Sequence, residues 1–223
     1  VDAVHGHNNI FGTTIFPHNI GLGCTMDPDL VQRVAEITAI EVAATGLNWT
    51  FSPCVAVPGD IRWGRAYEGF SQDPQLTSTL GVAAVKGYQG DDLSKRHTIL
   101  ACSKHYVGDG GAAWDTGDNK YKIDRGDAVM NEEDFRRIHL PPYVEAVNNG
   151  VGSVMVSYSS WNGEKCHGHA YLITDVLKNE LGFEGFVVSD WAGFRGIAED
   201  QKSDIIKAIN AGIDMIMLPG SKD

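Results

Sequence analysis

Segments typical of buried strands alternate with amphipathic helical patterns along the chain, and this alternation restricts the possible folds more than any other feature. The strand candidates are residues 47–57, 98–107, 152–158, 185–190 and 213–218. Helices are expected at 27–44, 73–89, 131–148, 174–181 and 203–211, several of them followed by a glycine that favours a helix end. The pattern therefore predicts an α/β protein whose parallel sheet has helical crossovers.

Two architectures fit this pattern, an open doubly wound sheet and a closed (β/α)8 barrel of the TIM type. No GxGxxG motif follows a strand, so nucleotide binding has no support. Polar residues at or just beyond the carboxyl ends of separate strands favour the barrel, because barrel active sites are assembled there. These residues are Asp2, Lys104, His105, Tyr158 and Asp190. The strand candidates are too few for a complete barrel, so we expect an incomplete one.

Charge and composition exclude several classes of partner. The formal net charge of −11 argues against a nucleic-acid partner, which would need clustered lysines and arginines. No apolar run approaches the roughly 20 residues that span a membrane, so no membrane partner is expected. The cysteines are scattered without a zinc or disulfide pattern. The chain starts at Val1 without an initiator methionine or signal-peptide pattern, and we expect it to be a fragment of a longer protein.

The motif GFVVSDW contains the strongest candidate for a reactive group. Asp190 follows an apolar, β-branched strand, and Trp191 comes directly after it. A rigidly held carboxylate beside an aromatic plate suits an enzyme that cleaves sugars, because the carboxylate stabilises or attacks an oxocarbenium-like centre and the indole packs against the ring. Asp190 could equally be the N-cap of a following helix. The motif alone leaves both interpretations open.

Lys104 and His105 form a second candidate pair. They could donate hydrogen bonds to sugar hydroxyls and hold a nearby carboxylate ionised. The alternative is a Lys–Asp pair at the surface beside a histidine satisfied in the core. Adjacent strand residues point to opposite faces, so we expect both to reach one pocket only where their strand ends.

Two further segments carry polar candidates. In Arg62-Trp63-Gly64-Arg65, one arginine can face solvent while the other forks onto a carboxylate or vicinal hydroxyls; a solvated arginine pair around a packed Trp63 is the alternative. Asp2 could accept hydrogen bonds from two sugar hydroxyls or be an ordinary surface carboxylate.

Metal and covalent chemistry have weaker signals. His5-Gly6-His7 lacks ligand partners at a recognisable spacing, so a hydrogen-bonded turn is favoured over a metal site. No serine lies in a GxSxG elbow. The long Gly- and Asp-rich loop at 108–126 is expected to be functional.

Seven segments, taken together and in order, resemble the N-terminal domain of family 3 glycoside hydrolases, the group of β-glucosidases and β-glucan exohydrolases. The segments are VDAVHGHNN, TIFPHNIGLG, FSPCVAV, RWGRAYEGFSQDP, CSKHYVGDGG, VMVSYSSWNG and GFVVSDW. The resemblance implies that residues 1–223 are most of a catalytic barrel and that a following α/β domain is absent. The loop GDGGAAWDTGD resembles the glucoside subgroup of the family.

The resemblance also implies roles for individual residues. Asp190 corresponds to the nucleophile and Trp191 to an aromatic wall, while Tyr158 lines the glucose subsite. The residues that grip the hydroxyls of the terminal glucose correspond to Asp2, Arg65, Lys104 and His105. The implied activity is exo-acting, retaining hydrolysis that releases glucose from the non-reducing ends of β-glucans or gluco-oligosaccharides. No cofactor and no catalytic metal are implied, and a periplasmic or secreted location is expected.

The second carboxyl group of that mechanism has no candidate in the sequence. In the family the general acid is usually a glutamate of the following α/β domain, and the segments around Glu41, Glu68 and Glu164 do not resemble its motif. We therefore expect the 223-residue chain alone to be nearly inactive on unactivated β-glucosides. Two alternatives remain: a non-catalytic glucan-binding module, and a barrel aldolase that uses Lys104 as a Schiff-base amine.

Overall fold

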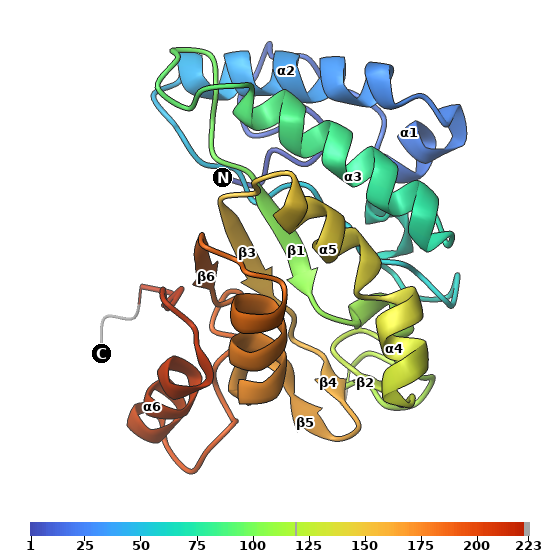
Figure 1. Ribbon diagram of the computed structural model, residues 1–223, viewed down its shortest axis with the longest axis vertical. Coiled ribbons are helices and arrows are strands. Elements are labelled where there is room, and N and C mark those ends of the chain that lie inside the picture. Colours follow the sequence, from blue (N-terminus) through green and yellow to red (C-terminus); the bar gives the residue numbers. More distant parts are fainter. Residues whose placement is uncertain (119, 221–223) are drawn as a thin grey trace.

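A short parallel sheet forms the centre of the computed structural model, which describes residues 1–118 and 120–220. Its strands are β1 (Cys102–Tyr106), β3 (Ser153–Val156) and β6 (Phe186–Val188), in the order β1-β3-β6 (Figure 1). Parallel bridges extend the array on both sides, from Trp49 to Leu100 and from Val188 to Met215. Each segment thus lies beside the next one along the chain, and the predicted α/β class with a parallel sheet is confirmed. Within the described residues the paired segments do not close into a barrel.

Helices cover this array and connect its strands. Figure 1 shows α2 and α3 running along one side of the molecule, with α5 packed on α3 and α6 near the carboxyl end. No helix in the described part of the chain has the length and apolar character needed to cross a membrane. The helical elements are α1 (Asn19–Thr25), α2 (Pro28–Ala44), α3 (Pro74–Gln89), α4 (Glu132–Ile138), α5 (Pro141–Asn148), α6 (Gln201–Ala211), the π-helix η4 (Tyr171–Glu180), and the short 3-10 turns η1 (Ala66–Glu68), η2 (Asp109–Gly111) and η3 (Cys166–Gly168).

The predicted beginnings of two helices are confirmed, and at both of them a side chain caps the backbone. Asp27 accepts a hydrogen bond from the Leu30 amide at 3.0 Å and begins α2, and Asp73 accepts one from Gln75 at 2.8 Å and begins α3. The predicted helix over 131–148 is wrong, because α4 ends at Ile138 and α5 begins at Pro141. Proline lacks an amide hydrogen and clashes with the preceding turn, so a helix cannot continue through it.

Two predicted strands are less regular than expected. Residues 47–57 form isolated bridges, Trp49 with Leu100 and Cys54 with Lys104, and residues 213–218 form a single bridge through Met215. Pro53 interrupts the first segment, since proline has no amide hydrogen to donate to a ladder. The helix α1 has no counterpart among the predicted elements.

The main core lies between the sheet and the helices. Strand residues such as Val154 and Val187 are fully buried in it together with Ala39 of α2 and Leu80 of α3. The two helices approach closely at Gly87, where an added Cβ would lie 2.3 Å from the carbonyl oxygen of Gln32. The packing of α2 on α3 therefore requires a residue without a side chain at this position.

A second, small sheet and a set of backbone bonds shape the loops beyond the strand ends. The sheet joins β2 (Asp127–Ala128), β4 (Ser160–Trp161) and β5 (Glu164–Lys165) in the order β2-β4-β5. The turn after β6 is bonded to the following segment. The Ser189 amide donates to the Met215 carbonyl at 2.9 Å, the Ala192 amide to the Met217 carbonyl at 3.0 Å, and the Met217 amide to the Ser189 hydroxyl at 2.7 Å.

Candidate active site

Most of the residues predicted to form a site lie together where the parallel strands end. Lys104 and His105 belong to β1, Tyr158 follows β3 by two residues, and Asp190 follows β6 by two residues. Asp2 joins this group through Lys104. The chain therefore brings side chains from well-separated segments to one edge of the sheet, as the sequence predicts.

A bulge in β1 explains how Lys104 and His105 serve the same site. Lys104 is opposite Met155 in β3 and Tyr106 is opposite Val156, so His105 is an extra residue without its own partner. Both residues lie among the last three of β1, close to the strand end at which the sequence predicts a shared pocket. An extra residue breaks the alternation of faces and redirects the side chains that follow.

Lys104 and Asp2 form an ion pair in which the lysine is buried and the aspartate is exposed. The Lys104 Nζ donates to Asp2 Oδ1 at 2.9 Å, and the two side chains are 5% and 60% exposed. A Lys–Asp pair, as in the alternative interpretation, is thus present, but only its aspartate lies at the surface. Because Asp2 remains exposed, its second oxygen is accessible to a polar ligand.

His105 lies at the centre of a buried polar network. Its Nε2 is 3.0 Å from Arg65 Nη2, and its Nδ1 is 2.9 Å from Asp109 Oδ2. A guanidinium group can only donate, so Nε2 must be the acceptor and Nδ1 must carry the proton that is donated to Asp109. Burial, together with the charges of Arg65 and Lys104, lowers the pKa of His105 to about 3. His105 is therefore neutral at physiological pH.

Arg65 is held in place by a carboxylate that the sequence prediction did not include. Its Nε and Nη2 atoms donate to the two carboxylate oxygens of Glu68, both at 2.8 Å. Burial opposes the ionisation of Glu68, but the bonds and the charge of Arg65 outweigh it and lower the pKa of Glu68. Arg62, by contrast, is 57% exposed and pairs with Asp60. The expectation that one arginine faces solvent while the other forks onto a carboxylate is confirmed.

The carboxyl group of Asp109 has an unusual environment. It is buried, and its Oδ1 accepts a hydrogen bond from the Gly110 amide at 3.0 Å while its Oδ2 accepts one from His105. Burial raises the pKa of Asp109 to about 6 in spite of the nearby positive charge of Arg65.

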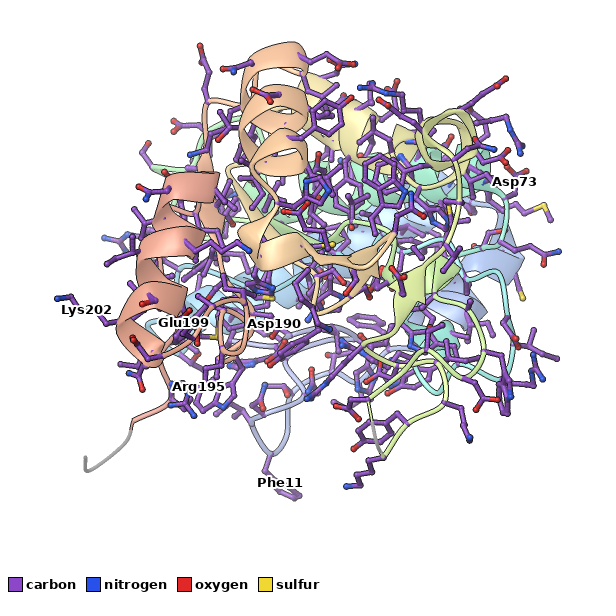
Figure 2. The ribbon with its side chains drawn as sticks, turned by 90° about the horizontal axis from the view of Figure 1, so that it is seen from below. Phe11, Asp73, Asp190, Arg195, Glu199 and Lys202 are labelled. Atoms are coloured by element: carbon purple, nitrogen blue, oxygen red, sulfur yellow. The ribbon has the colours of Figure 1, made fainter. Side chains whose placement is uncertain are left out.

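Asp190 lies in a tight turn with one oxygen held by the backbone. Its Oδ1 accepts a hydrogen bond from the Trp191 amide at 2.6 Å, while its Oδ2 is 3.8 Å from His105 Nε2. Asp190 is not a helix N-cap, because residues 191–200 form turns and bends, and α6 begins at Gln201 with Asp200 as its cap. The carboxylate is 13% exposed. In the view of Figure 2, Asp190 lies well within the outline of the molecule and Lys202 lies at its edge.

Trp191 and Tyr158 lie next to Asp190 and are bonded to each other. The Trp191 side chain is 58% exposed, so its indole face is available for packing. The Tyr158 hydroxyl donates to the Trp191 carbonyl oxygen, and the Arg125 guanidinium lies 4.3 Å from the centre of the Tyr158 ring. Desolvation and the nearby Asp190 carboxylate raise the pKa of Tyr158 to about 12. Tyr158 therefore stays protonated and keeps its bond to the turn.

Three residues of this site are absent from the sequence prediction: Glu68, Asp109 and His167. Glu68 lies three residues after Arg65 in RWGRAYE, a spacing that could have indicated a pair. Asp109 stands in the long loop four residues after His105. His167 has no local signal, since its contact with Asp190 joins segments 23 residues apart.

The segment His5-Gly6-His7 forms a hydrogen-bonded turn, as the sequence favours. His5 Nδ1 is 2.9 Å from the Phe16 carbonyl oxygen, and the His5 ring stacks on His18 at 3.9 Å. His7 is buried, with its Nε2 3.0 Å from Thr45 Oγ1. Among the residues whose structure is described, no cluster of three or more His, Cys, Asp or Glu side chains is arranged to hold a metal ion.

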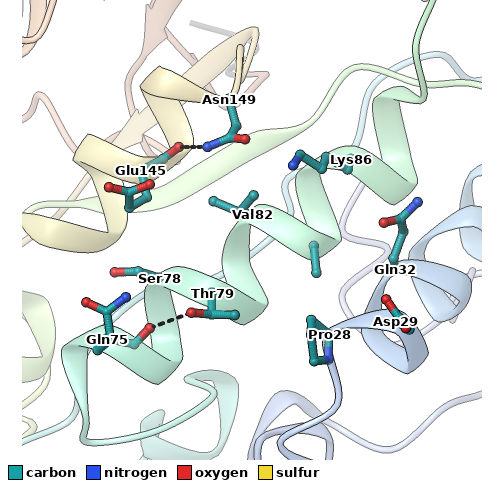
Figure 3. A pocket seen from close by; sticks show the side chains of 11 residues that line it. Pro28, Asp29, Gln32, Gln75, Ser78, Thr79, Val82, Lys86, Glu145 and Asn149 are labelled. Atoms are coloured by element: carbon teal, nitrogen blue, oxygen red, sulfur yellow. Dashed lines mark hydrogen bonds between the residues drawn. The ribbon is translucent and has the colours of Figure 1, made fainter.

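Cavities elsewhere on the surface do not coincide with this site. A groove of about 420 Å³ lies among α2, α3 and α5, and none of the predicted site residues lines it (Figure 3). A cavity of about 540 Å³ adjoins the site through Arg65 and is also lined by Trp114 and Tyr121 of the long loop. The loop at 108–126 thus contributes to the surroundings of the site.

Comparison with known proteins identifies the family. Residues 1–223 match the glycosyl hydrolase family 3 N terminal domain over their whole length. The chain belongs to glycosyl hydrolase family 3. This confirms the family that the sequence motifs indicate.

Several proteins are similar to this family 3 chain. It is 36% identical to the lysosomal beta glucosidase of Dictyostelium discoideum over 98% of its residues, and 35% identical to the periplasmic beta-glucosidase of Salmonella typhimurium over 97%. The crystal structure of an exo-1,3/1,4-beta-glucanase from a Pseudoalteromonas species is similar over 98% of the chain, with a TM-score of 0.90 and 48% identity. The chain spans 27% of the length of each of these proteins.

Proposed function

We propose that this chain carries the nucleophile of a retaining, exo-acting β-glucoside hydrolase, which releases glucose from the non-reducing ends of β-glucans or gluco-oligosaccharides. The names of its relatives, two β-glucosidases and an exo-β-glucanase, support the substrate class. The observation that carries the proposal is the placement of Asp190. Its carboxylate lies beside an exposed tryptophan and within 3.8 Å of a buried histidine at the end of the sheet.

The surrounding side chains suit a terminal glucose. Arg65 and Lys104 are donors, and the exposed oxygen of Asp2 is an acceptor, so that together they can bind vicinal hydroxyls. His105 and Tyr158 complete the polar lining, and Trp191 supplies an aromatic face for the sugar ring. A glucose ring needs this combination of convergent polar groups and one apolar wall.

The geometry distinguishes the two oxygens of Asp190 in a double displacement. Oδ1 is bound to the Trp191 amide, so Oδ2 is the oxygen that would attack the anomeric carbon. The new C–O bond forms as the bond to the leaving-group oxygen breaks and an acid protonates that oxygen. Water then cleaves the glycosyl-enzyme with net retention. The two carboxyl groups of such enzymes lie about 5–5.5 Å apart.

None of four described carboxyl groups suits the role of general acid. Glu68 is ionised and bound to Arg65, and Glu41 accepts bonds from the Thr14 backbone and hydroxyl. Glu164 is exposed, 3.7 Å from His169. Asp109 has the raised pKa of an acid, but it is buried behind His105 with both oxygens bonded. We therefore assign the acid to a following α/β domain.

This assignment includes a proposal for the domain organisation and the location. Residues 1–223 would be most of the N-terminal catalytic domain, and the parallel segments would be part of a (β/α)8 barrel. The arrangement of consecutive parallel neighbours supports the barrel. A periplasmic or secreted location is supported by the periplasmic relative from Salmonella typhimurium.

The test is covalent trapping on the full-length protein. A 2-deoxy-2-fluoro-β-glucoside with a good leaving group should inactivate the enzyme with one label per chain, on the peptide that contains Asp190. Asp190→Asn should abolish both turnover and labelling, whereas Asp175→Asn, at an exposed position on η4, should retain both. Proton NMR should show β-glucose as the first product. Labelling of another residue, or α-glucose as the first product, would reject the proposal.

A further inference from the structure

His167 makes a hydrogen bond to the backbone of the proposed nucleophile. The Asp190 amide donates to His167 Nε2 at 3.0 Å. His167 belongs to η3, which follows the β4–β5 pair of the small sheet, so the bond joins that sheet to the turn after β6. We propose that His167 is a positioning residue for Asp190, an inference that rests on the proposed function of Asp190.

The bond requires one state of the imidazole ring. A backbone amide can only donate, so Nε2 must be unprotonated and the single proton must lie on Nδ1. The side chain is 1% exposed, and burial lowers the pKa of His167 to about 3. The ring is therefore a neutral acceptor at neutral and mildly acidic pH, and its bond to Asp190 does not titrate there.

The turn at Asp190 is held by further hydrogen bonds besides the one to His167. The Gly193 amide donates to the Asp190 carbonyl oxygen at 3.0 Å, and the Trp191 amide donates to the carboxylate. His167 holds the amide of the same residue. Without it, the Asp190 amide would be left without this acceptor, and the turn could rotate about its remaining bonds.

The imidazole ring also fixes the position of the turn by contact. A Cβ added at Gly193 would lie 2.4 Å from Cε1 and 2.5 Å from Nε2 of His167, so the turn lies directly against the ring. On another side the Tyr158 ring lies 6.0 Å away, tilted by 46°. Tyr158 is in turn bonded to the Trp191 carbonyl. His167 thus supports both the carboxylate and the wall beside it.

A purely space-filling role would predict a different response to mutation. An apolar side chain of similar volume could occupy the same cavity, whereas only an acceptor at the position of Nε2 can bind the Asp190 amide. His167 does not contact the carboxylate oxygens in the described structure, so its effect on the reaction must pass through the backbone of Asp190. A displacement of a reacting group by about 1 Å can reduce a rate roughly 100-fold.

The experiment compares two variants of the full-length protein. His167→Gln keeps an acceptor near the position of Nε2, and His167→Met has similar bulk without a strong acceptor. With an aryl β-glucoside we expect His167→Met to reduce kcat about 10- to 100-fold with KM changed less than about threefold. We expect His167→Gln to recover most of kcat. Hydrogen exchange should show a faster Asp190 amide in His167→Met and near-normal protection in His167→Gln.

The outcomes separate this inference from the proposed function. Equal losses of kcat in both variants, in proportion to their loss of thermal stability, would overturn the positioning role, as would wild-type kcat in His167→Met. If the wild-type protein does not hydrolyse β-glucosides, the proposed function fails. In that case the exchange measurement decides the inference, because unchanged protection of the Asp190 amide in His167→Met would overturn it.

Discussion

Replacement of Asp109 by asparagine should change how the stability of the chain depends on pH. The pKa of this carboxyl group rises from an ordinary 3.8 to about 6 because it is buried. One pKa unit corresponds to about 1.36 kcal/mol, so ionised Asp109 costs the folded state ~3 kcal/mol. Between these two pKa values the folded chain binds a proton that the unfolded chain releases. The stabilisation from protonated Asp109 is therefore complete below pH 3.8 and is lost as the pH rises through 6.

Asparagine removes this dependence and adds a cost that does not vary with pH. Both partners of Asp109, the His105 ring and the Gly110 amide, are N–H donors. One amide oxygen cannot satisfy both, so the variant should lose one buried hydrogen bond, a cost of about 1–3 kcal/mol. At pH 7.5 this loss is offset by the removal of the buried charge, and the two proteins should have similar stability. At pH 4 the wild-type chain should be more stable.

The assay is urea unfolding of the 223-residue chain and its Asp109→Asn variant, followed by tryptophan fluorescence at several pH values. The stability difference between the two proteins should grow by ~2 kcal/mol from pH 7.5 to pH 4 in favour of the wild type. His105 is present in both proteins, so its own titration cancels to first order. Asp91→Asn, at an exposed position, controls for the loss of one carboxylate. A difference that stays constant, or that grows as the pH rises, would refute the reasoning.

Three other substitutions test the site and its support. Glu68→Gln removes the charged partner of Arg65. It should destabilise the chain by about 2–3 kcal/mol in urea unfolding and raise the KM of the full-length enzyme about tenfold. An unchanged KM would contradict this. Trp191→Ala should raise KM for gluco-oligosaccharides about tenfold. Its free energy of unfolding should change by less than ~0.5 kcal/mol, since the indole is exposed. A large loss of stability would show that the indole is structural. Gly87→Ala should lower stability by about 2–3 kcal/mol through its clash with Gln32, and an unchanged melting temperature would argue against that close approach.

The sequence predicts the parts of this molecule that depend on local chemistry. The caps Asp27 and Asp73 place the beginnings of α2 and α3, because a side-chain acceptor close to the helix start decides each boundary. The change from apolar to polar residues at a strand end similarly identifies Asp190 and Lys104. In both cases the signal lies within a few residues of the feature that it predicts.

The parts that the sequence did not predict depend on distant partners. The bulge at His105 is defined by the register of β1 against β3, which local residue types do not set. His167 reaches Asp190 because η3, which follows β5, lies against the turn after β6. The break between α4 and α5 is an exception, since Pro141 could have indicated it and the helical periodicity around it concealed the signal.

The backbone bonds between residues 189–192 and 215–217 have a practical consequence for truncation and for recombination with related domains. A chain that ends after α6 would keep every site residue proposed within residues 1–223, because the last of them is Trp191. It would nevertheless lose Met215 and Met217, whose backbone groups bind Ser189 and Ala192. The turn that contains Asp190 would then be released on one side while its sequence remained intact. Exchange points between related enzymes should therefore lie beyond Met217, even though the last proposed site residue of this chain is Trp191.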